Sequence, residues 1–210
     1  MREERVRSRV RRDAVTPAPR RLHGDGGSII AEAALLTPFF ITLMFGMLEF
    51  GGAFRDYLTL ANGTASAARQ AAIQGNSPVA DWQILYSIEK STLAMPFSQI
   101  QSVVIYKGAA DSSSPAANCT SLNQCNTYNA TDLASMKACG TAPCGAWALN
   151  TYPAELTWNA TTRQVLVNGP PDYVGIYVTI SHPWITGLFG NSLTMKSNNV
   201  AQIEPQKLSS

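Results

Sequence analysis

The chain has 210 residues, of which 14% are charged, and its formal net charge is +2. This length has room for one domain with appended segments, and the charged fraction is low for a soluble domain. Residues 1–27 contain eight arginines and four acidic residues, whereas residues 70–210 contain six basic and seven acidic residues. A nearly neutral body and a short basic segment without aromatic residues argue against a nucleic-acid partner.

A long apolar run over residues 29–48 follows the arginine-rich segment. Twenty helical residues cover about 30 Å, the thickness of the hydrocarbon core of a bilayer. The arginines predict that the N-terminus is cytoplasmic and that the rest of the chain is extracytoplasmic. No small-residue cleavage site of a secretory signal follows the run. A buried helix of a soluble protein would not account for the arginines or the low charge, so the run is predicted to span a membrane.

One carboxylate, Glu32, lies just inside this apolar run, directly after the small residues Gly26, Gly27 and Ser28. A charged side chain at the centre of a bilayer costs about 2.5–3.5 kcal/mol or more, and less near an interface. A chain that keeps a carboxylate at this position is expected to use it. Glu32 is therefore a candidate functional residue.

The predicted fold class is α+β. Alanine-rich sequence continues the first helix until Gly75-Asn76-Ser77-Pro78 stops it, which predicts one helix over residues 28–75 whose first half spans the membrane. Residues 79–210 are predicted to form a small antiparallel sheet domain with a packed helix, because the connections are too short for parallel crossovers. The helix is expected to be capped by Asp81 and to reach about Met95. Strands are predicted at residues 100–106, 163–167, 173–180 and 193–203.

All four cysteines lie in a predicted loop over residues 108–153: Cys119, Cys125, Cys139 and Cys144. Neither the spacing within the pairs nor the two histidines fit a usual zinc site, so no metal is expected. On the outer side of a membrane, two disulfides are the simpler reading. Short loops close at the lowest entropic cost, which favours Cys119–Cys125 and Cys139–Cys144, although long-range packing could favour another pairing.

No motif for catalysis occurs in the sequence: it has no Gly-x-Ser-x-Gly, no phosphate-binding glycine loop and no histidine pair. His182, followed by Pro183 and Trp184, is expected to be a packed residue at the end of a strand rather than a catalytic base. We therefore expect no enzymatic activity and no cofactor.

Three segments of the helix resemble the TadE-like family, the pilin-like (pseudopilin) proteins of the Tad tight-adherence pilus system: residues 28–38, residues 45–51 and the alanine-rich residues 65–72. Residues 178–183 and 193–205 are similar to the family's less specific C-terminal end. The resemblance implies a subunit of an adhesion pilus and secretion apparatus, held in the bacterial inner membrane or in the pilus. Its expected partners are a prepilin peptidase, other pilin-like subunits and the inner-membrane pilus machinery.

The resemblance also implies processing. In this family a prepilin peptidase cuts after a glycine whose fifth following residue is glutamate. Here that count makes Gly27 the last residue of a leader over 1–27, Ser28 the first mature residue and Glu32 the fifth. Glu49 matches the glutamate of the family's Glu-Phe-Gly element and is expected at the outer interface, with a role in assembly beside Glu32. The alternative function is an uncleaved single-pass anchor that displays an extracytoplasmic binding module.

Overall fold

The computed structural model describes residues 26–149, 151, 157–166 and 169–205. Of the predicted leader, only Gly26 and Gly27 fall within the described residues. The chain divides into two compact units, Met1–Leu43 and Met44–Ser210, and each is described by itself.

Helix α1 extends from Gly26 to Gln74, as predicted. Within the first unit its described side chains, from residue 27 to residue 43, are all exposed. Within the second unit one face of α1 becomes buried, beginning with Glu49 and Ala53. Gly75, directly after the last helical residue, terminates the helix: its φ of 54° is the left-handed conformation that glycine adopts at little steric cost.

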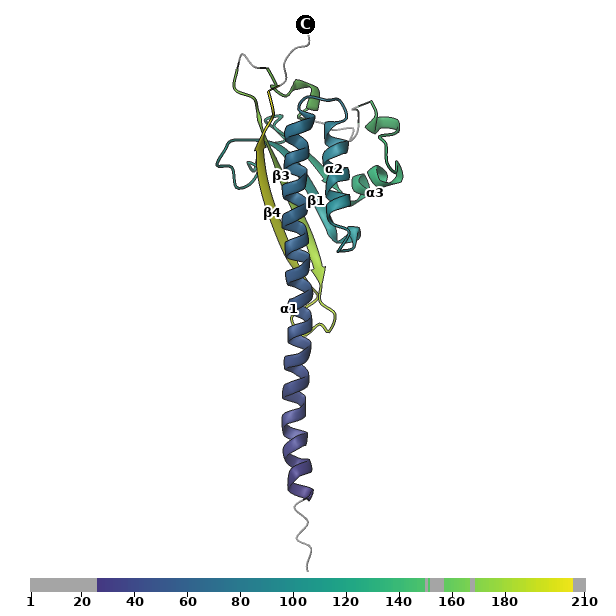
Figure 1. Ribbon diagram of the computed structural model, residues 1–210, viewed down its shortest axis with the longest axis vertical. Coiled ribbons are helices and arrows are strands. Elements are labelled where there is room, and N and C mark those ends of the chain that lie inside the picture. Colours follow the sequence, from purple (N-terminus) through teal and green to yellow (C-terminus); the bar gives the residue numbers. More distant parts are fainter. Residues whose placement is uncertain (1–25, 150, 152–156, 167–168, 206–210) are drawn as a thin grey trace, which may run out of the picture. The chain divides into compact units, whose positions relative to one another are not determined.

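The second unit contains a four-stranded antiparallel sheet with the strand order β2-β1-β3-β4. The strands are β1 (Ile100–Gly108), β2 (Cys125–Asn129), β3 (Tyr173–Pro183) and β4 (Ser192–Gln202). Helix α2 (Ala80–Ser91), helix α3 (Ala130–Ala138) and the second half of α1 cover one face of this sheet (Figure 1). The α+β prediction is therefore confirmed.

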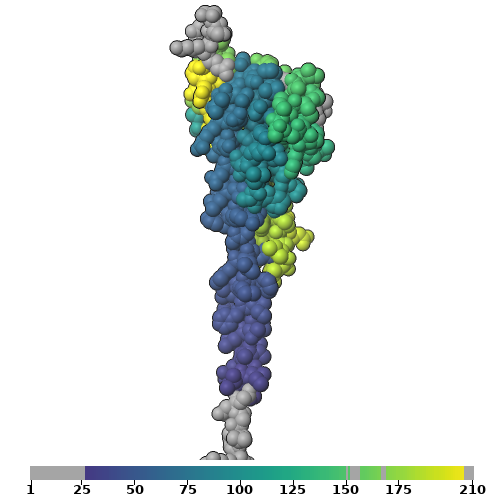
Figure 2. All heavy atoms as spheres, turned by 45° about the vertical axis from the view of Figure 1, so that its right-hand side comes forward, coloured from purple at the N-terminus to yellow at the C-terminus, as the bar shows by residue number. Residues whose placement is uncertain are grey.

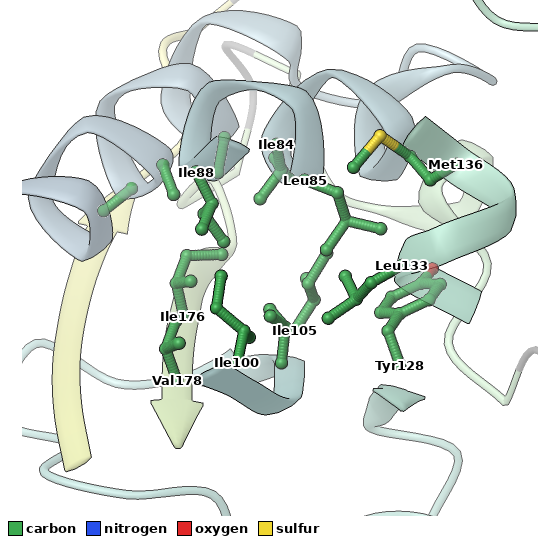
Figure 3. Packing of buried hydrophobic residues seen from close by; sticks show 14 of the residues in the cluster. Ile84, Leu85, Ile88, Ile100, Ile105, Tyr128, Leu133, Met136, Ile176 and Val178 are labelled. Carbon is green, nitrogen blue, oxygen red and sulfur yellow. The ribbon is translucent and has the colours of Figure 1, made fainter. Parts of the chain in front are cut away.

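Alternating burial along β3 explains how the sheet meets the helices. Val174, Ile176, Val178 and Ile180 are fully buried, while Tyr177 and Thr179 between them are partly exposed. This is the period-2 pattern of a strand with one covered face. Figure 3 shows Ile88 of α2 next to Ile176 of β3, with Val178 further along that strand and with Leu133 and Met136 of α3 on the other side of the core.

Three local predictions were wrong. Asp81 does not cap α2, which begins at Ala80 with Val79 as an uncapped N-cap residue and ends at Ser91. Residues 163–166 form no strand beyond a single bridge at Leu166, and Val167 lies outside the described residues. The segment 108–153 is not a continuous loop, because it contains β2 and α3.

Both predicted disulfides are confirmed. Cys119 bonds Cys125, and Cys139 bonds Cys144, each with a Cα–Cα distance of 5.4 Å. The first disulfide closes the turn that leads into β2, and the second follows the end of α3. Each therefore fixes a short connection beside an ordered element.

A buried polar network takes the place of the predicted cap at Asp81. Its carboxylate accepts hydrogen bonds from the Asn126 side chain and the Tyr128 hydroxyl, both at 2.7 Å, and forms an ion pair with Arg163. The Arg163 side chain is fully buried and lies over the Trp158 ring. Burial and the adjacent Asp81 carboxylate raise the pKa of Tyr128 well above its ordinary value, so this hydroxyl stays protonated as a donor. The network fastens the segment around Trp158 to α2 and β2.

Replacing Asp81 by alanine should therefore destabilise the second unit strongly. Removing one partner of a buried ion pair leaves the other charge uncompensated, which costs about 3–5 kcal/mol. The control is Lys107→Ala, which removes an exposed lysine from its ion pair with Asp172 and should cost only about 1 kcal/mol, because the lysine is not left buried and the charge lost lies at the surface. Urea unfolding in detergent, followed by tryptophan fluorescence, measures both. Equal, small losses would show that the network is not a principal support of the fold.

Candidate functional site

The first half of α1 presents its side chains outward. Within the described residues it belongs to the one helix that is long and apolar enough to cross a membrane. Glu32 lies on this surface, and its carboxylate accepts a 3.4 Å hydrogen bond from the Ser28 hydroxyl one turn earlier. A Cβ built on Gly27 would meet no atom within 4 Å. The predicted processing residues are thus on an uncovered helix surface.

Glu49 lies in the second unit, where it is buried rather than solvated. Its side chain reaches the connection between β3 and β4 and accepts backbone N–H bonds from Ile185, at 2.9 Å, and Thr186. The Thr186 hydroxyl adds a third bond at 2.8 Å. Charge-assisted bonds to a carboxylate are stronger than bonds between neutral groups. The residue is therefore a structural tie between α1 and the hairpin, and its predicted role in assembly stays a prediction.

A second carboxylate on the same face of α1 meets the same hairpin two helical turns later. Asp56 is fully buried and lies 2.7 Å from Nδ1 of His182, at the end of β3. Arg55 also bonds Asp56, at 2.9 Å, from the solvent side. His182 follows Ile180 on the buried face of β3. The prediction that His182 is a packed strand-end residue is confirmed, and Asp56 is the partner that sequence reasoning missed.

The hairpin tip, defined as residues 184–191, lies beyond the paired ends of β3 and β4. In Figure 2 the yellow-green spheres of this part of the chain project from the second unit. Trp184 and Phe189 pack on Phe50 of α1, with ring centroids 5.9 and 4.9 Å away. Ile185 and Leu188 remain 85% and 54% exposed. The glutamate and phenylalanine of the Glu-Phe-Gly element therefore both hold the tip, one by hydrogen bonds and the other by ring contacts.

Other parts of the described chain offer little for chemistry. Within the described ranges, no three His, Cys, Asp or Glu side chains are grouped as metal ligands. A surface pocket of about 460 Å³ lies between β1 and α3, lined mainly by apolar residues such as Phe97 and Leu133, with Lys137 at its side. Lys137 lies 3.9 Å from the Glu89 carboxylate and over the Phe97 ring, and these contacts account for it as part of the packing between α3 and its neighbours.

Replacing Glu49 by alanine should release the hairpin tip while leaving the sheet folded, because three hydrogen bonds to the tip are lost and the sheet ladder is not touched. Glu49→Gln should have a smaller effect, since its amide keeps one acceptor oxygen. Hydrogen exchange of a peptide covering residues 184–191 measures this release. The control is Asp111→Asn, which changes an exposed carboxylate outside the hairpin. Unchanged exchange in Glu49→Ala would show that the tip is held by its ring contacts alone.

The part of the chain that forms most of α1 also matches a known protein family. Residues 27–69 match the family model described as TadE-like protein. No curated protein and no solved structure matches the chain. The matched segment contains Glu32, the Glu49 tie and Asp56. Over residues 27–69, the chain is therefore similar to the TadE-like family.

Proposed function

We propose that this protein is a pilin-like subunit that a prepilin peptidase processes and that assembles into a Tad-type adhesion pilus or its secretion apparatus. The observation that carries the proposal is the coincidence of the TadE-like match with an uncovered apolar helix. Glu32 lies on that helix, at the fifth position after Gly27. The proposed role is structural, not catalytic.

Assembly needs a surface that other subunits can bind, and the first half of α1 has this property. All its described side chains from residue 27 to residue 43 are exposed within the unit that contains them. In a bilayer, lipid covers such a surface. In a fibre, apolar helices of neighbouring subunits take the place of lipid, and the small residues of the helix allow close approach.

Glu32 gives this helix packing a defined register. Cleavage after Gly27 creates an amine on Ser28, four residues before Glu32 and on the same helix face. Since an unpaired carboxylate is unfavourable among apolar side chains, a positively charged amine offsets its cost. When the amine belongs to a neighbouring subunit, assembly requires prior cleavage and the axial offset between helices is fixed. This dependence on cleavage distinguishes a pilin-like subunit from an uncleaved anchor that displays a binding module.

Gly27→Arg should block processing, because a protease that holds the backbone closely has no space for a bulky cationic side chain at the cleaved bond. The matched control is Gly24→Arg, which places the same residue three positions earlier and should be processed normally. Intact mass of the membrane-extracted protein distinguishes the two forms. A Gly27→Arg protein that begins at Ser28 would show that the site is wrong.

Glu32→Ala and Glu32→Gln should both insert and be processed almost normally but lose co-assembly. Glutamine retains the size of the side chain and loses its charge, so a charge partnership predicts similar losses for both variants. The readouts are pull-down of partner pilin-like subunits and surface pilus yield, each expected to fall several-fold. Glu204→Ala, at an exposed carboxylate of the second unit, is the control. Normal yield from both Glu32 variants would contradict the proposed mechanism.

A further inference from the structure

The hairpin tip has the composition of a membrane-interface segment. Residues 183–195 contain no Asp, Glu, Lys or Arg. Trp184 is partly exposed, while Ile185, Leu188 and Phe189 are exposed at 85%, 54% and 46%. Aromatic residues with apolar bodies are enriched where a bilayer meets water. In a soluble loop, four apolar side chains gathered at one turn would be costly to hydrate.

The tip is held at the level where the apolar run of α1 ends. That run reaches Leu48, and the next residue, Glu49, accepts the N–H groups of Ile185 and Thr186. Glu49 therefore holds the tip one residue beyond Leu48, where the sequence places the boundary between lipid and water. All these residues belong to the same compact unit.

Five backbone N–H groups of the hairpin tip already have hydrogen-bond partners, which suits a segment with little water around it. The N–H groups of Ile185 and Thr186 bond Glu49, and that of Leu188 bonds the Thr186 hydroxyl. Two more bonds, from Trp184 to the Asn191 carbonyl and from Gly190 to the Gly187 carbonyl, close the turn. Unsatisfied backbone groups are what makes irregular loops costly near hydrocarbon. Five satisfied donors reduce that cost.

Apolar surface continues from the tip onto the neighbouring elements. A shallow groove of about 370 Å³ lies between α1 and β4, lined by Phe50, Ala53, Phe54, Tyr57, Leu193 and Met195. Phe50 belongs both to this groove and to the ring cluster with Trp184 and Phe189. The tip is therefore continuous with an apolar surface on α1 and β4.

We propose that the hairpin tip inserts its apolar side chains into the outer interface of the bilayer, as a second membrane contact beside α1. A lipid interface fits better than a protein partner, because α1 already places a bilayer at the level of Glu49. This contact would hold the second unit close against the membrane before assembly. The inference rests on the proposed membrane span of α1, and the test separates the two.

Tryptophan quenching in vesicles tests the insertion. The full-length protein is reconstituted into vesicles whose lipids carry bromine near the headgroup end of the acyl chains. Trp82, Trp147 and Trp158 are no more than 5% exposed, so they serve as shielded internal references. Bromine should quench a component of the wild-type fluorescence that is absent from Trp184→Phe. Ile185→Asp should reduce that component several-fold, whereas Leu149→Asp, at an exposed leucine outside the tip, should not.

The outcomes assign failure to one proposal or the other. Flotation with vesicles after alkaline extraction reports on α1 alone. A protein that floats but shows the same quenching with and without Trp184 would overturn the tip insertion and leave the span intact. A protein that does not float would overturn the span, and with it the tip insertion. Shielding of Trp184 from acrylamide by a co-reconstituted pilin-like subunit instead of by lipid would identify the tip as a protein interface and overturn the proposal.

Discussion

The buried carboxylate of Glu49 is the contact on which the arrangement of α1 and the β3–β4 connection in the second unit depends. Helix α1 has a dual task, since its first half is an apolar candidate span and its second half is part of the folded domain. A helix that leaves a domain needs a defined place where burial begins. Glu49 provides it by accepting backbone donors of Ile185 and Thr186, 136 and 137 residues later in the chain. The contact between Asp56 and His182 joins α1 to the end of β3 two helical turns further along.

The two glutamates of α1 therefore lie in different environments. Glu32 lies on an uncovered helix surface, with Ser28 of its own chain beside it, and is free to pair with a group from another molecule. Glu49 has its hydrogen bonds within the unit and is almost fully buried. A carboxylate that is already satisfied has little to gain from a new partner. In our proposal, Glu32 therefore directs assembly and Glu49 maintains the shape of the subunit.

Local patterns predicted much of the fold, and long-range contacts account for most of what they missed. The alternating pattern of β3 and the glycine stop at Gly75 are local signals, and the structure confirms the strand and the helix end that they predicted. Helix α3 also has a local signal, the capping box of Asn129 and Asp132, although its segment was predicted to be part of a loop. The strand β2 reads Cys-Asn-Thr-Tyr-Asn, without apolar alternation, because Asn126 faces the buried Asp81 network. The ties at Glu49 and Asp56 join residues more than 120 positions apart, where no spacing rule applies.

The central claim is that the uncovered half of α1 becomes an assembly surface only after the leader is removed. N-terminal sequencing of the wild-type protein, extracted from membranes of its own host, tests this most directly. The account predicts that the sequence begins Ser28-Ile29-Ile30-Ala31-Glu32, so that a charged amine lies one helical turn before the carboxylate. A protein that begins at Met1 in the membrane and in sheared pili would contradict it.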